Sequence, residues 1–359
     1  DEIRCWGANR VGELGRTPLA HGRAVRLADV PAARELALVR DHLVVIDDDG
    51  HARVRPLGSV ETGEALTGLG VLSGIAEATE TLACANADDG ALVCLDPARG
   101  SHRRFEGFGG RGRVLGVAGR ACAAIDGDAV RCVELLSRDE DGAPHVLARG
   151  VRDPVAYEGL VCGLRGTGAV ACVSALQERY RRDGVRFRET LPEIPGRVST
   201  LFAGAEQMFA VRADGSAVVL GHNGVGQLGR APSRPIERAA PAVLPAGRTA
   251  MAFGFHVSCA YGAGAGVTCA GIDETLAPRR SPTGALFAAF GGPPPDQSVR
   301  GDGGWTEIDG PAGARSVSIG DRDLACAAAD DGAVWCWGRW PAGAELERVT
   351  EPIIVQLGE

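Results

Sequence analysis

The sequence predicts an all-β fold, a seven-bladed β-propeller whose hairpins are stapled by disulfides. Three observations predict it. Cysteines recur in pairs ten positions apart, a turn signal with glycine lies inside each pair, and the units recur mostly at intervals near 40–50 residues. That interval matches one four-stranded blade, and a closed ring of blades can form one unit of 359 residues. We therefore expect residues 1–359 to form a single propeller domain.

The paired cysteines occur in five segments: Cys84 and Cys94, Cys122 and Cys132, Cys162 and Cys172, Cys259 and Cys269, and Cys326 and Cys336. Two further segments keep the pattern with Val44 and Val54, or with Phe209 and Val219. Cysteine occupies both positions or neither, as expected of covalent partners. Residues opposite each other in an antiparallel pair lie roughly 4.5–5.5 Å apart, within the range that a disulfide requires. We predict five disulfides.

Two other interpretations of the cysteines stay open at this point. One is ten buried free thiols, because cysteine is a common small core residue. The other is zinc, although a ten-residue interval lacks the closely spaced cysteines of structural zinc sites. Disulfides would indicate an oxidising compartment, so we expect an extracytoplasmic protein that is secreted, periplasmic or at the cell surface.

The turn signal is a glycine six residues after the first marked position in five segments: Gly50, Gly90, Gly168, Gly215 and Gly332. In the other two segments glycine stands one residue to the side, as Gly127 in one and as Gly264 with Gly266 in the other. A three-residue hairpin loop needs a left-handed residue at its last position, which glycine adopts without a Cβ penalty. We therefore expect tight hairpins.

Three segments depart from the regular spacing. Cys5 lies in CWG, which recurs at 336–338, so residues 1–28 match the second half of a hairpin and are expected to complete ring closure. Cys5 is either a leftover thiol at a mature terminus or part of a hairpin that begins before Asp1. Residues 176–194 and 274–312 are expected to be insertions between blades.

Composition argues against two classes of function. All 38 basic residues are arginine, and the net charge is −8. A nucleic-acid binder needs a dense basic face, so we expect no nucleic-acid partner. No run of eighteen apolar residues occurs, so we expect no membrane span. We expect a monomer.

A second motif carries a family resemblance. WGANRVGELGR at 6–16 and LGHNGVGQLGR at 220–230 align without a gap, which matches Asn9 with Asn223 and Leu14 with Leu228. The motif resembles the W-G-x-N-x-x-G-Q-L-G repeat of the regulator of chromosome condensation family, whose members are seven-bladed β-propellers. The D-G hairpin followed by VWCWG resembles the preceding half of that repeat. We expect the asparagine amides to hydrogen-bond local backbone.

The resemblance implies that the chain binds proteins. The founding member acts on a small GTPase and on chromatin, while secreted bacterial relatives, including an inhibitor that caps β-lactamases, bind proteins through one propeller face. Hairpin disulfides make this chain similar in character to the secreted bacterial members.

No catalytic motif is present, so we expect no enzyme, no cofactor and no resident metal. The seven histidines are scattered without metal-site spacing. Asp47, Asp48 and Asp49 precede Gly50, and a hairpin turn explains them. DEDG at 139–142 lacks the other ligands of a calcium loop.

The first insertion carries an arginine and aromatic cluster that we single out as the tentative partner-binding surface: Tyr180, Arg181, Arg182, Arg186, Phe187 and Arg188. Arginine and tyrosine often dominate interfaces. The alternative is a solvated outer strand pair. Arg300, Gly301 and Asp302 in the second insertion form an integrin-type tripeptide, which arises easily in such loops.

The sequence therefore predicts a non-enzymatic, extracytoplasmic propeller that binds an unidentified protein through its inter-blade loops. The rival hypothesis is an enzyme or a carbohydrate-binding propeller with a site over the central channel. A group of carboxylates or histidines with perturbed ionisation at the channel mouth would favour the rival.

Overall fold

The structure is a computed structural model. It describes residues 4–8, 25–26, 32–57, 64–110, 112–117, 119–125, 129–135, 143–175, 194–204, 206–271, 304–308, 310–320, 324–337 and 348–354. Every regular element in these ranges is a β-strand. They contain no helix that could cross a membrane. The prediction of an all-β fold is confirmed.

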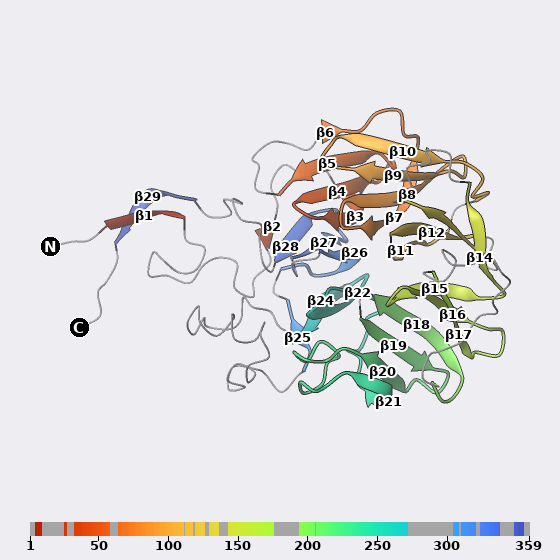
Figure 1. The fold of residues 1–359 in the computed structure, drawn as a ribbon. Helices are drawn as coiled ribbons and strands as arrows, with labels where there is room; N and C mark the ends of the chain where they lie inside the picture. Colours follow the sequence, from red (N-terminus) through yellow and green to blue (C-terminus); the bar gives the residue numbers. More distant parts are fainter. Residues whose placement is uncertain are drawn as a thin grey trace, which may run out of the picture.

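Seven antiparallel sheets form the blades, numbered here in chain order (Figure 1). Their strands run from the inner to the outer edge as follows: blade 1, β3 (Ala33–Val39), β4 (His42–Asp47), β5 (Ala52–Pro56) and β6 (Glu64–Ala65); blade 2, β7 (Leu72–Thr79), β8 (Leu82–Ala87), β9 (Leu92–Asp96) and β10 (Ser101–Phe105); blade 3, β11 (Val114–Val117), β12 (Arg120–Ile125), β13 (Ala129–Glu134) and β14 (His145–Arg149); blade 4, β15 (Arg152–Tyr157), β16 (Leu160–Leu164) and β17 (Val170–Ser174); blade 5, β18 (Val198–Gly204), β19 (Gln207–Arg212), β20 (Ala217–Gly221) and β21 (Ile236–Ala242); blade 6, β22 (Ala250–Phe253), β23 (Val257–Gly262), β24 (Ala265–Gly271) and β25 (Thr306–Glu307); blade 7, β26 (Ala314–Ile319), β27 (Ala325–Ala329), β28 (Val334–Trp337) and β2 (Val25–Arg26).

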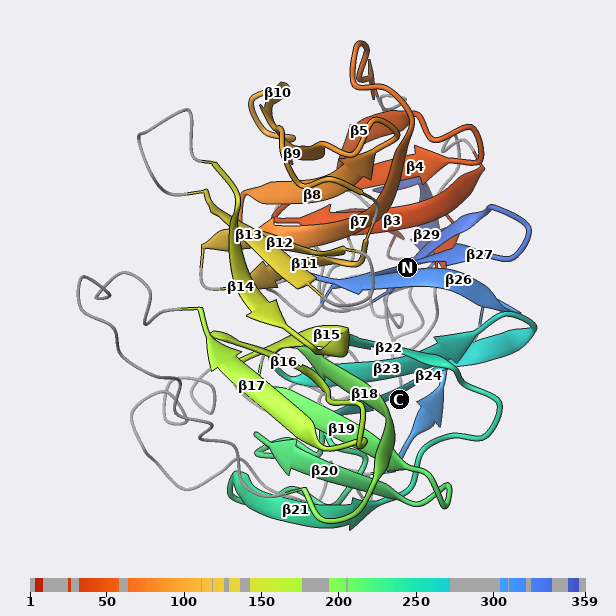
Figure 2. The ribbon, with the colours of Figure 1, turned by 90° about the vertical axis from the view of Figure 1, so that its right-hand side faces the viewer.

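The blades close into a ring through their inner strands. Each of β3, β7, β11, β15, β18, β22 and β26 contacts the next, and β26 contacts β3. Figure 2 shows the blades following one another around the molecule. Blade 7 combines three strands from near the C-terminus with β2 from near the N-terminus, where Val25 lies opposite Cys336. A separate two-stranded sheet pairs β1 (Arg4–Ala8) with β29 (Arg348–Ile354), with Cys5 opposite Ile353.

All five predicted disulfides are confirmed. Each joins the second and third strands of its blade, with Cα–Cα distances of 4.0–4.1 Å. The two cysteine-free hairpins keep the same register, because Val44 lies opposite Val54 and Phe209 lies opposite Val219. The structure therefore supports neither free thiols nor zinc at these ten positions. The register explains why both cysteines are present or absent together.

The turn glycines have the predicted backbone conformation. Gly50, Gly90, Gly168, Gly215 and Gly332 have φ between 79° and 86°. Each amide donates to the carbonyl three residues earlier, as in the 3.0 Å bond from Gly50 to Asp47. In three blades the carbonyl of this glycine also accepts a bond from the first strand of the next blade: Leu72 to Gly50, Val198 to Gly168 and Ala33 to Gly332. The last of these bonds joins blade 7 to blade 1. Gly127 lies outside the described residues.

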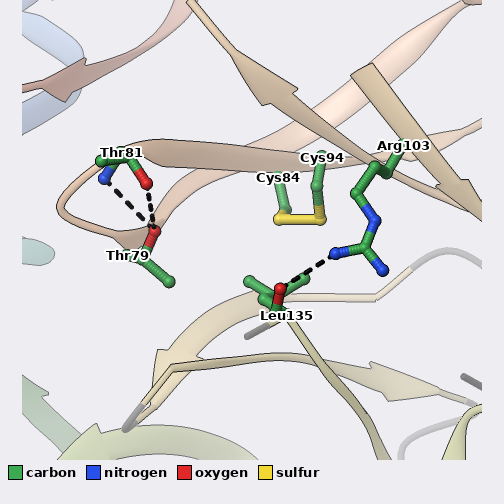
Figure 3. The surroundings of a disulfide bond; sticks show 6 residues. All are labelled: Thr79, Thr81, Cys84, Cys94, Arg103 and Leu135. Carbon is green, nitrogen blue, oxygen red and sulfur yellow. Dashed lines mark hydrogen bonds between the residues drawn. A yellow bond between two sulfur atoms is a disulfide. The ribbon is translucent and has the colours of Figure 1, made fainter. Parts of the chain in front are cut away.

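The hydrophobic core is divided among the seven interfaces between neighbouring blades. Seven clusters of buried side chains each combine residues from two consecutive blades. Every disulfide lies in the cluster shared with the following blade, and its cysteines are at most 8% exposed. Figure 3 shows the Cys84–Cys94 disulfide beside Arg103, which donates a 2.9 Å bond to the Leu135 carbonyl in blade 3. The disulfides therefore form part of the surfaces through which neighbouring blades pack.

A sixth disulfide is expected to form when Val44→Cys and Val54→Cys are combined. The two valines are opposite each other at the staple position of blade 1 and are 0% and 8% exposed. Closing this eleven-residue loop should raise the free energy of unfolding by about 2–3 kcal/mol in the chain-entropy model. Urea unfolding under non-reducing conditions compares this variant with Val44→Cys combined with Val54→Ala, which cannot form the crosslink. Equal free energies of unfolding in the two variants would contradict a crosslinking effect.

Candidate protein-interaction face

The two ends of the ring differ in the connections that they carry. We call one end the staple-turn face, because it carries the turns between second and third strands. The other end is the inner-turn face, which carries the turns between first and second strands. Because neighbouring strands are antiparallel, each third strand ends at the inner-turn face. The segments that follow β17 and β24 therefore both begin at this face.

The partner-binding residues predicted in the first insertion, 180–188, lie outside the described residues, as does the tripeptide at 300–302. The structure describes only where the insertions join the ring. The first follows Ala175 and ends at Ile194. Part of the second insertion belongs to blade 6, because β25 pairs with β24. Their assignment as a recognition surface remains a prediction.

The inner turns of four blades carry acidic side chains: Asp41 in blade 1, Glu80 in blade 2, Glu158 in blade 4 and Glu206 in blade 5. Two of them act on one tyrosine. Burial raises the pKa of Tyr157, and the charge and hydrogen bond of Glu158 together with the charge of Glu206 raise it further. Tyr157 therefore stays neutral and protonated beside the two carboxylates. Glu158 and Glu206 lie in the inner turns of adjacent blades, whose inner strands β15 and β18 contact each other.

The inner turn of blade 6 carries an aromatic residue instead. Phe255 lies between β22 and β23 and is 49% exposed. Its turn is closed by a 2.8 Å bond from the Gly254 amide to the Val257 carbonyl. The Phe255 carbonyl accepts two further bonds, 3.2 Å from Gln207 Nε2 and 3.1 Å from Gln227 Nε2. We call these two glutamines the amide clamp. Both are fully buried in blade 5.

The N-x-x-G-x-L-G motif at 223–229 builds half of this clamp. Asn223 is fully buried, its Nδ2 donates 2.8 Å to the Ala231 carbonyl and its Oδ1 accepts 3.0 Å from the Leu228 amide. The expectation that Asn223 hydrogen-bonds local backbone is confirmed. These bonds fold the segment so that Gln227 Oε1 accepts from the Val225 amide while its Nε2 reaches the next blade. The motif thus joins blade 5 to blade 6.

Glycine in the motif also has a packing role. Gly229 has φ of 66°, and a Cβ there would collide with the Trp305 indole. Trp305 lies 6.0 Å from Phe209, ring centroid to centroid, and Phe253 lies 5.9 Å from the same ring. Phe209 occupies a staple position, so an aromatic cluster fills this interface where other blades have a disulfide.

The staple-turn face carries interactions between charged side chains and neighbouring turns. Arg34 donates 2.9 Å to the Leu72 carbonyl in the next blade, and Arg315 of blade 7 pairs with Asp48 of blade 1 at 3.5 Å. Arg315 also donates to the Asp330 carbonyl. The staple turns also contain many aspartates, several of which bond to arginine or to nearby backbone amides.

The DDDG segment behaves as the predicted turn. Asp47, Asp49 and His51 have potential ligand atoms within 4.8 Å of one another. However, Asp47 Oδ1 accepts bonds from the backbone amides of Asp49 and His51, at 3.1 and 2.8 Å. Backbone hydrogen bonding therefore accounts for this carboxylate.

Ionisation in the ring interior is perturbed around an arginine and a tyrosine. Burial lowers the pKa of Arg113, which precedes β11, while Tyr261 of blade 6 and Asp153 of blade 4 act on its charge. Burial raises the pKa of Tyr261, and Arg113 opposes that shift. These groups come from three different blades. They are an arginine, a tyrosine and an aspartate, whereas the rival hypothesis requires a group of carboxylates or histidines.

Solved structures show the same fold. Human WBSCR16 is 12% identical with a TM-score of 0.56, and the match covers 95% of this chain and 100% of that one. Prp20p from Saccharomyces cerevisiae, the yeast RCC1, is 16% identical with a TM-score of 0.50, covering 94% and 80%. PorZ of Porphyromonas gingivalis is 14% identical with a TM-score of 0.55, covering 94% and 39%. No protein-family model and no curated protein matches the chain.

The protein is a seven-bladed β-propeller. Identities this low establish the fold alone. They confirm the propeller fold that the resemblance to the regulator of chromosome condensation family implied. The likeness to the secreted β-lactamase inhibitor is not confirmed by these structures and stays a prediction.

The sequence motifs did not indicate the inner-turn residues Glu158, Glu206 and Phe255. The repeat pattern of cysteines and glycines begins at the second strand of each blade and does not include the turn before it. The signal was nevertheless present. The inner turns of four blades contain Asp or Glu, whereas GFH at 254–256 substitutes an aromatic residue. Comparing these turns would have singled out Phe255.

Proposed function

We propose that this seven-bladed propeller is a non-enzymatic, extracytoplasmic scaffold that binds a protein partner through its inner-turn face. The observation that carries the proposal is the rigid ring itself: five blades with buried disulfides form the frame, and both long insertions leave it at one face. Rigid frames that present long loops are a common design for recognition.

The cysteines support an extracytoplasmic compartment. Five disulfides are typical of proteins that fold in an oxidising environment and are rare in the cytosol. Two of the similar structures support the binding role by analogy of fold. Prp20p is described by its binding to Gsp1p and histones, and PorZ is a bacterial surface component of a secretion system. This chain need not share their partners, because fold alone does not determine function.

Capture of a partner from the native secretome tests the proposal. Replacing Tyr180→Ala together with Arg182→Ala is expected to weaken the captured complex at least tenfold, because Tyr and Arg side chains most often dominate interfaces. Arg238→Ala, an exposed arginine on the outer strand β21, is the matched control and should leave binding unchanged. Surface plasmon resonance with the captured protein measures both. Unchanged binding in the double variant would remove the insertion from the interface.

A further inference from the structure

Phe255 combines an exposed side chain with a fixed backbone. The ring is 49% exposed, yet the turn that carries it is held by three hydrogen bonds, two of them from the amide clamp. Single exposed apolar residues need no explanation on most surfaces. Here two fully buried glutamines from a different blade converge on one carbonyl of the same turn, which is not needed to close that turn.

Among the described residues, two buried polar atoms at the amide clamp and the Phe255 turn make no hydrogen bond, which lowers the stability of the fold. Gln207 Oε1 and Ser258 Oγ are buried without a hydrogen-bond partner in the described part of the chain. Ser258 is the second residue of β23, directly after the Phe255 turn, and Gln207 bonds to the carbonyl of that turn, so both residues adjoin it. Leaving buried polar atoms unpaired destabilises a fold, and such violations concentrate at functional positions. The physical result is a fixed backbone at Phe255, which reduces the conformational freedom that the turn loses when its aromatic side chain is covered.

The inner turns of the two blades that precede the Phe255 turn carry carboxylates. Gln207 of the clamp directly follows Glu206, and Glu206 acts on Tyr157 together with Glu158. The acidic turns of blades 4 and 5 therefore lead to the aromatic turn of blade 6 along consecutive blades. The chain has a net charge of −8, which attracts cationic partners over longer distances.

We propose that the inner turns of blades 4–6 dock a basic segment of a protein partner, which packs an apolar side chain on Phe255 and places cations beside Glu158 and Glu206. This inference rests on the proposed scaffold function and names the surface and the chemistry of its partner. Arginine is the best match for such a segment, because its guanidinium pairs with carboxylates and also stacks on aromatic rings.

A defined probe tests this site without knowledge of the natural partner. The probe is a fluorescein-labelled twelve-residue peptide of repeated Gly-Arg-Phe, and its comparators are repeats of Gly-Glu-Phe and Gly-Arg-Ala. Fluorescence anisotropy is expected to show binding of the Gly-Arg-Phe peptide at least tenfold tighter than binding of either comparator. The affinity should fall as NaCl rises, because exposed charge pairs are screened by salt.

Variants locate the binding. Phe255→Ala should weaken the Gly-Arg-Phe peptide about tenfold, and Glu158→Gln with Glu206→Gln should weaken it and flatten its salt dependence. Phe255→Tyr should bind like the unchanged protein. Val243→Ala, 78% exposed at the staple-turn face, and Asp88→Asn, exposed at a staple turn, are the matched controls and should change nothing. Thermal unfolding checks that each variant is folded.

Three results would overturn the inference: no preference for the Gly-Arg-Phe peptide, equal losses in variants and controls, or tighter peptide binding when Arg181→Gln and Arg182→Gln are combined. The last result would indicate that the arginines of this chain's own first insertion occupy the acidic turns and compete with the peptide. The scaffold proposal and the docking-site proposal can be told apart by experiment. If a captured partner binds Phe255→Ala normally but loses the Tyr180 and Arg182 variant, the scaffold proposal stands and this docking site does not.

Discussion

Unfolding the protein in guanidinium with a thiol reductant is expected to leave it unfolded after the denaturant is diluted into reducing buffer. Each disulfide closes a loop of about eleven residues, worth about 2–3 kcal/mol in the chain-entropy model. Five such loops therefore contribute about 10–15 kcal/mol, which is comparable to the whole net stability of a typical protein. Tryptophan fluorescence and circular dichroism measure recovery, and mass spectrometry counts the free thiols.

The control is the same cycle without reductant, which should restore the native signal. Reductant added to the folded protein should act slowly, because the cysteines are at most 8% exposed and lie in the interfaces between blades. Full refolding under reducing conditions would show that blade packing alone stabilises the ring and would weaken the argument for an oxidising compartment.

Gly116→Ala is expected to lower the free energy of unfolding by about 3 kcal/mol, at the upper end of overpacking effects. Gly116 lies on the inner strand β11, where it faces the backbone of β7 in the neighbouring blade. An added Cβ would lie against the Glu77 carbonyl, 2.6 Å from Ala78 Cα and 2.7 Å from Ala78 O. Backbone atoms of a packed strand cannot rotate away, so the two blades would have to separate.

Gly215→Ala is the matched control for this prediction. Its φ is 83°, but a Cβ there would meet nothing within 4 Å, so only the left-handed conformation opposes alanine, at a cost of about 1 kcal/mol. Urea unfolding compares the two variants through their midpoints at equal slope. Equal losses of unfolding free energy in the two variants would show that the close approach between β11 and β7 adds no penalty for a Cβ at Gly116.

Much of the fold could be predicted because the information is local. The interval between Cys84 and Cys94 sets two residues opposite each other across a three-residue loop, and the glycine in that loop is required by its positive φ. The loop length of a hairpin sets which residues lie opposite each other. The predicted pairing was therefore also correct in the two hairpins where valine or phenylalanine replaces cysteine. Counting such hairpins predicted seven blades without any knowledge of how they pack.

The candidate site could be predicted only in part. Asn223 was correctly expected to bond local backbone, since an Asn side chain in a turn reaches its own neighbourhood. The role of Gln227 was not foreseen, because its partner is the Phe255 carbonyl in another blade. No pattern within one repeat indicates which atom of the next repeat lies within hydrogen-bond distance.

The amino-acid sequence by itself determined the hairpins, their staples and their number, because these depend on contacts between residues about ten positions apart. Only the tertiary structure shows which neighbouring blade each disulfide packs against and which turns lie on the same face. It placed every disulfide against the following blade and brought Glu158, Glu206 and Phe255 onto one face of the ring. These juxtapositions join residues of different blades, and they arise from the packing of one sheet on the next.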